Sequence, residues 1–116
     1  PDTGDDREAF GDAVAGTVTG LLALIGVDAD PITSREHILL STILATAWGR
    51  GESLDLAGLI GQVQAPPFER VGVLDLEAFY PQKERFGLAM AFDFDLFISP
   101  APGFQFDQPI RFQVYP

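Results

Sequence analysis

The sequence predicts a mainly α protein, a small bundle of three or four helices followed by a short extended or β-hairpin C-terminal tail. Apolar residues recur at the three-to-four-residue spacing of a helical face in successive stretches before residue 92. Glycine, proline and aspartate separate these stretches, and beyond residue 92 apolar residues alternate with a period of two, as in strands. We therefore expect one domain over residues 1–116, with a helical bundle at 5–91 and an irregular or β tail at 92–116.

The first helix is predicted over residues 5–26. Acidic residues occupy its first turn, where free backbone amides favour carboxylates, and Gly26 suits the left-handed residue that ends many helices. Gly11, Gly16 and Gly20 each cost about 1 kcal/mol relative to alanine, so packing must hold this helix, or the glycines let another helix approach closely. Its apolar face consists of Phe10, Val14, Val18, Leu21, Leu22 and Ile25.

A second helix lies in the stretch "ITSREHILLSTILATAWGRG", residues 32–51. Thr33 and Glu36 have the spacing of a capping box, and Gly49 and Gly51 are stop signals. Apolar residues cover most of its circumference, which is typical of a central helix, so we assign it to the core. These residues are Ile38, Leu40, Ile43, Leu44, Ala47 and Trp48.

A third, short helix is predicted over residues 54–64, with Ser53 as its cap and Pro66 and Pro67 beyond its end. It carries Asp55 in its first turn and Leu56, Leu59, Ile60 and Val63 at helical spacing.

The chain then continues with an extended run from Val71 to Leu74. Asp75 caps one turn of helix that reaches Tyr80, and a longer helix begins at Pro81 or Gln82, because proline is tolerated in a first helical turn.

The alternation in the tail predicts strands or extended segments. Phe92, Phe94 and Leu96 alternate with polar residues, and so do the apolar residues of 104–107 and 110–115. A β-hairpin of 104–107 and 110–115 is one arrangement that fits this pattern, but an isolated two-stranded ribbon is marginally stable unless it packs on the helices.

Charge and composition exclude several classes of function. The chain has 7 Lys and Arg against 17 Asp and Glu, a formal net charge of −10, which repels nucleic-acid phosphates and anionic membranes. The apolar runs are shorter than the roughly 18 to 20 residues that span a bilayer. With no cysteine, disulfides and thiolate chemistry are excluded.

The amino terminus, "PDTGDDREAF", is acidic where a secretory signal is basic and then apolar, so a cytoplasmic location is expected. The chain begins at Pro1 instead of methionine, and we expect it to be a segment of something longer or a processed product.

The chain resembles bacterial P-loop ATPases in two irregular stretches and in the order in which they occur. These stretches are "DPITSREHILLS" and "PPFERVGVLDLEAFYP". Residues 8–91, approximately, resemble an internal helical segment of the HerA/FtsK-type ATP-binding proteins. The resemblance implies a helical subdomain between the Walker A loop and the Walker B strand, with both catalytic motifs outside it. The last 25 residues depart from the family pattern, in which the helix continues beyond Met90.

No catalytic, cofactor-binding or metal site is assigned. A Walker A loop needs glycines before its lysine, and Lys83, the single lysine of the chain, has none. The run "VGVLDLE" imitates a Walker B strand, but without a phosphate loop we interpret Asp75 as a helix cap. His37, beside Glu36, has no nucleophile motif and no second histidine, and is interpreted as structural.

The acidic pairs are interpreted as solvated charge, because no calcium loop accompanies them. They are Asp5 with Asp6, Asp28 with Asp30, and Asp93 with Asp95.

The aromatic residues leave core and partner-binding roles open. Core packing is favoured for Trp48. Phe68 and Phe79 flank prolines and turns, so both roles stay open for them, as they do for Tyr80 and Phe86. Apolar surface left uncovered in an isolated segment predicts self-association.

The function that the sequence favours is a non-catalytic accessory subdomain of a HerA/FtsK-like ATPase, with the remainder of that ATPase as partner. One alternative is an acidic interaction or oligomerisation module. A second is a small enzyme, which requires Glu36, His37 and Asp75 to converge on one pocket.

Overall fold

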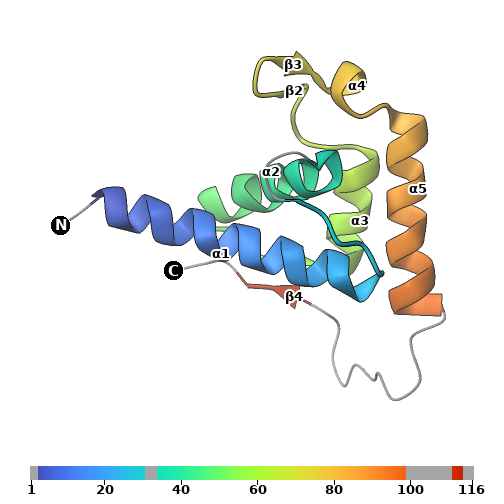
Figure 1. The fold of residues 1–116 in the computed structure, drawn as a ribbon, viewed down its shortest axis with the longest axis horizontal. Helices are drawn as coiled ribbons and strands as arrows, with labels where there is room; N and C mark the ends of the chain where they lie inside the picture. The colour runs from blue at the N-terminus through green and yellow to red at the C-terminus, as the bar shows by residue number, and fades with distance from the viewer. Residues whose placement is uncertain (1–2, 31–33, 99–110, 114–116) are drawn as a thin grey trace.

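A computed structural model describes residues 3–30, 34–98 and 111–113. The protein is mainly helical with short antiparallel strand pairs, which confirms the predicted fold class (Figure 1). α1 and α2 pack side by side, and α3 packs against both α2 and α5. The core lies between these helices.

α1 (Thr3–Leu24) ends as predicted. Gly26 has a φ of 77°, and the amides of Gly26 and Val27 donate to the carbonyls of Ala23 and Leu22 at 3.0 and 2.9 Å, the bond pattern of a Schellman cap. A Cβ added at Gly11, Gly16 or Gly20 meets nothing within 4 Å. Within the described residues these glycines therefore accommodate no neighbouring helix.

α2 (Arg35–Gly49) begins one residue later than the predicted capping box requires. Ser34 is the N-cap: its Oγ accepts from the amide of His37 at 3.4 Å and donates to Glu36 Oε2 at 2.8 Å. The hydroxyl that reaches the third helical amide is thus that of residue 34, and Thr33 lies outside the described residues. Gly51, with a φ of 74°, closes the helix as predicted.

The assignment of α2 to the core is confirmed. Trp48 is 8% exposed, packs edge-on against Phe10 and donates from Nε1 to the carbonyl oxygen of Phe112 at 3.3 Å. The buried residues of α2 are His37, Leu39, Leu40, Ile43, Leu44, Ala47 and Trp48.

α3 (Leu56–Gln64) is capped by Asp55, and the prediction of Ser53 as its cap is wrong. The Asp55 carboxylate accepts from the amide of Gly58 at 2.7 Å. The cap lies at Asp55 and not at Ser53 because β1 (Leu54–Asp55) pairs antiparallel with β4 (Arg111–Phe112). This pairing holds residue 54 extended, so the helix starts after residue 55.

Asp55→Ala is expected to lower the free energy of unfolding by about 1 kcal/mol, the usual cost of losing a side-chain cap. Ser53→Ala is the matched control and is expected to change it by less than about 0.5 kcal/mol. Urea unfolding followed by circular dichroism measures both. An equal loss in the two variants would contradict the assignment of the cap to Asp55.

The extended run predicted from Val71 to Leu74 is instead a tight hairpin of β2 (Arg70–Val71) and β3 (Leu74–Asp75). Gly72, with a φ of 63°, takes the first turn position, as two-residue hairpin loops of type II′ require. The hairpin projects from the helices (Figure 1).

Two helices follow the hairpin, as predicted: α4 (Leu76–Phe79) and α5 (Gln82–Phe92). Asp75 occupies the N-cap position of α4 but its side chain makes no capping hydrogen bond. The amide of Leu76 donates instead to the carbonyl of Glu69 at 2.9 Å.

The strand predicted to begin at Phe92 is wrong, because α5 includes Phe92 and a π-helix, η1 (Asp93–Ile98), follows. Phe92 and Leu96 are 0% and 4% exposed, whereas Phe94 between them is 56% exposed. Residues spaced by two also contain a pair spaced by four, so a short alternating run fits one helical turn as well as a strand. β4 is extended as predicted, but its described partner is β1, and 104–107 lie outside the described residues.

Candidate functional site

The residues of the candidate enzyme site are not connected. His37 is bonded to Thr19 and Ser41, the Glu36 carboxylate accepts from Ser34, and Asp75 is exposed on the hairpin. Among the described residues no hydrogen bond joins Glu36, His37 and Asp75 to one another.

His37 links α1 to α2 and is 1% exposed. Its Nε2 lies 2.9 Å from Thr19 Oγ1, and its Nδ1 lies 3.1 Å from Ser41 Oγ. A neutral imidazole has one donor and one acceptor nitrogen, and a hydroxyl can meet either. Both ring nitrogens are therefore engaged, Nε2 with α1 and Nδ1 within α2, which agrees with a structural role.

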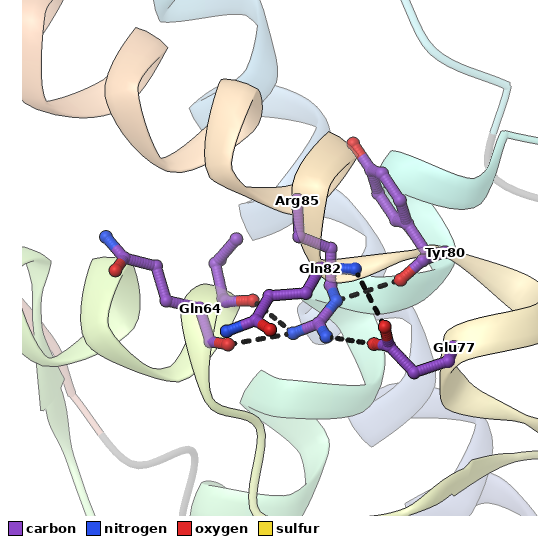
Figure 2. Close-up of polar contacts among 6 residues, drawn as sticks. Gln64, Glu77, Tyr80, Gln82 and Arg85 are labelled. Carbon is purple, nitrogen blue, oxygen red and sulfur yellow. Dashed lines mark hydrogen bonds and ion pairs between the residues drawn. The ribbon is translucent and has the colours of Figure 1, made fainter.

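The densest polar cluster is centred on Arg85, which is 3% exposed and lies on α5. Nε donates to the carbonyl of Tyr80 at 2.8 Å, and Nη1 donates to the carbonyls of Val63 and Gln64 at 3.0 and 2.9 Å. Nη2 donates to Glu77 Oε2, completing the network drawn in Figure 2. We call Arg85, Glu77 and the three carbonyls the Arg85 clamp.

The Arg85 clamp provides hydrogen-bond partners for backbone groups at the ends of helices. The last carbonyls of a helix have no partner within it and carry partial negative charge, which a cation neutralises. Val63 and Gln64 end α3, so Arg85 serves as its C-terminal cap from a distant element. Glu77 in turn accepts from the amide of Gln82, the first residue of α5, at 3.2 Å (Figure 2). One cluster thereby connects α3, α4 and α5.

A second contact connects this region to α2. Tyr80 is 3% exposed, and the Arg35 guanidinium lies 4.3 Å from the centroid of its ring. Arg35 also forms an ion pair with Glu84. Burial raises the pKa of Tyr80, and the Glu36 carboxylate adds to this effect. Tyr80, whose role the sequence left open, is thus a packing residue.

The Arg85 hydrogen bond, followed by that from the Gln82 amide, lowers the pKa of Glu77 below its ordinary 4.5. A carboxyl whose pKa is lowered by folding contributes stability above its ordinary pKa and loses that contribution as the pH falls through the folded-state pKa. Wild-type protein is therefore expected to lose stability on acidification from the region of the ordinary value downward.

Glu77→Gln is expected to reduce this acid-induced loss, which urea unfolding at a series of pH values between about 6 and 3 measures. Glu52→Gln, at an exposed residue after α2, is the matched control and should retain the wild-type profile. Identical profiles for wild type and Glu77→Gln would rule out this role of Glu77.

The Arg85 clamp is not predicted from the sequence, although the sequence holds a signal of it. Arg85 stands three, four and seven residues before the buried Leu88, Ala89 and Phe92, a spacing that places it on the buried face of α5. A cation at a core position is almost always paired when buried, but the sequence does not specify that its partners are carbonyls of α3.

The remaining candidates lie outside these clusters. Lys83 is exposed on α5, and Asp93 and Asp95 are half-buried in η1. No group of histidine and acidic residues suited to a metal ion occurs among the described residues. Over the same part of the chain, no helix combines the length and apolar character needed to cross a membrane.

The arrangement suits packing and helix capping better than acid–base chemistry. No protein-family model matches the sequence, and neither a curated protein nor a solved structure shows significant similarity to it.

Proposed function

We propose that the chain is a non-catalytic helical accessory subdomain of a HerA/FtsK-like P-loop ATPase, which docks on the remainder of that ATPase through apolar surface. The resemblance over residues 8–91 supports the class of partner. The packing and capping contacts of His37, Tyr80 and Arg85 support a non-catalytic role for these residues.

The observation that carries the docking proposal is an apolar row on the outer side of α5 and η1. Phe86 is 53% exposed, Phe94 is 56% exposed, and the half-buried Met90 lies between them, four residues from each. Residues four apart share a helix face. We call Phe86, Met90 and Phe94 the α5 row. Large exposed apolar side chains grouped on one face mark interaction surfaces.

The hairpin adds a second apolar contact. Val73, at its turn, is 89% exposed, and the neighbouring Leu74 is 51% exposed. The Arg85 clamp joins α4, which follows the hairpin, to α5, which carries Phe86 and Met90. In this proposal nucleotide chemistry belongs to the partner, the location is cytoplasmic, and the acidic chain itself avoids nucleic acid.

The docking proposal is tested by self-association of the isolated chain, measured by size-exclusion chromatography with light scattering over a range of concentrations. The double variant Phe86→Ser/Phe94→Ser is expected to weaken the concentration-dependent association, because it removes the exposed apolar area. Lys83→Ser, at another exposed position of α5, is the control and should leave the association unchanged. Unaltered association in the double variant would rule out docking through the α5 row.

The same exposed row favours a second candidate function, an acidic oligomerisation module. The two differ in stoichiometry. A defined oligomer that persists on dilution to low micromolar concentration would favour the oligomerisation module, whereas weak association without a fixed stoichiometry would favour an accessory subdomain that lacks its partner.

A further inference from the structure

A groove of about 610 Å³ runs along the helix pair α1–α2, on elements that contribute nothing to the α5 row. Its walls are residues of α1 between Arg7 and Ala15 and residues of α2 between His37 and Thr46. We call it the α1–α2 groove.

The length of the groove matches a helix. At a rise of 1.5 Å per residue, the lining segments 7–15 and 37–46 extend for about 12 to 14 Å, somewhat more than two helical turns. A long, open groove between two helices is the shape in which an amphipathic helix docks, with its apolar face inward.

The lining permits close approach of such a helix. Gly11, Ala15 and Ala45 are small. Thr42 and Thr46 donate their hydroxyls to carbonyls one turn earlier in α2, each at 2.7 Å, so both hydroxyl donors are already engaged within the helix.

The charged residues beside the groove favour a basic partner. Glu8 and Asp12 are exposed, lie one turn apart on α1 and adjoin the lining residues Gly11 and Ala15. The opposite wall, α2, carries no charged residue from Ile38 to Thr46. Arg7, a lining residue of α1, supplies a cation at one end of the groove. Glu8 and Asp12 would repel an acidic helix in the groove and attract a basic one.

We infer that the α1–α2 groove binds a basic amphipathic helix of a partner protein, whose apolar face lies in the groove and whose basic row faces Glu8 and Asp12. This inference does not depend on the ATPase assignment, and it concerns a surface separate from the α5 row.

The test uses a fluorescent synthetic peptide of about 18 residues, long enough to form a helix, with leucine and alanine on one face and lysine in the flanking rows. Fluorescence anisotropy on titration with the whole chain measures its affinity. A peptide with glutamate at the lysine positions tests the charge, and one with the same composition in scrambled order tests the apolar face.

Gly11→Leu is the decisive variant. A Cβ at Gly11 meets nothing within 4 Å, and Gly11 lines the groove, so a leucine there is expected to occupy groove space. Gly16→Leu is matched to it: the same helix, the same substitution and equally open space, but a position outside the lining. Circular dichroism confirms that both variants are folded.

The lysine peptide is expected to bind wild type and Gly16→Leu with equal affinity, and Gly11→Leu about tenfold or more weakly, a change of about 1.4 kcal/mol. Glu8→Gln/Asp12→Asn should weaken binding, and the glutamate and scrambled peptides should bind less well than the lysine peptide. Absence of binding, or equal affinity in Gly11→Leu and Gly16→Leu, would overturn the inference. So would a dimer that Gly11→Leu abolishes, because a second copy would then occupy the groove.

Discussion

Replacing Trp48 by alanine is expected to lower the free energy of unfolding by about 3 to 5 kcal/mol, the range for large core aromatics. Trp48 is 8% exposed, contacts Phe10 from α1 and donates its indole N–H to Phe112 of β4. Its loss would leave a cavity where α1, α2 and the β1–β4 pair meet. Urea or thermal unfolding monitored by circular dichroism measures the effect.

Phe86→Ala is the matched control, because it removes an aromatic ring that is 53% exposed. It is expected to cost less than about 1 kcal/mol. A loss below about 1 kcal/mol for Trp48→Ala would contradict the assignment of α2 to the core.

Arg85→Ala is expected to cost about 3 kcal/mol, since hydrogen bonds to charged groups are each worth roughly 1.5 to 3 kcal/mol and do not add fully. The substitution leaves the carbonyls of Tyr80, Val63 and Gln64 without their donor. It also removes the charge that offsets the negative end of α3. Chemical unfolding, with Lys83→Ala as the exposed control on the same helix, measures the difference.

Arg85→Lys separates geometry from charge. An ammonium group retains the positive charge but lacks the planar fork that reaches three carbonyls and Glu77 together. We expect Arg85→Lys to recover less than half of the loss in Arg85→Ala. Full recovery would show that charge alone accounts for the stabilisation by the Arg85 clamp.

Much of the fold could be predicted because local rules and tertiary packing agree. The apolar face of α1, the nearly all-apolar α2, and the left-handed glycines Gly26 and Gly51 each signal one structure. The N-cap of α3 shows where local sequence rules do not decide between two candidates. Ser53 and Asp55 are both good N-caps, and the pairing of β1 with β4, a contact far apart in sequence, decides between them.

The tail and the candidate site required information that the sequence does not contain locally. The alternation of Phe92, Phe94 and Leu96 fits a strand or a helical turn, and burial of Phe92 and Leu96 on the face toward the core resolves it as helix. Arg85 has a helical spacing that signals burial, but its partners on α3 become known only from the packing of α3 against α5.

The proposal that nucleotide chemistry belongs to the partner is tested by calorimetric titration of the isolated chain with ATP and Mg²⁺ at high protein concentration. We expect no saturable heat, because Lys83 lacks a glycine loop and Asp75 lies exposed on a hairpin. Saturable binding that Lys83→Ala or Asp75→Asn weakens, while the fold is retained, would contradict the proposal and would assign these residues to a nucleotide site.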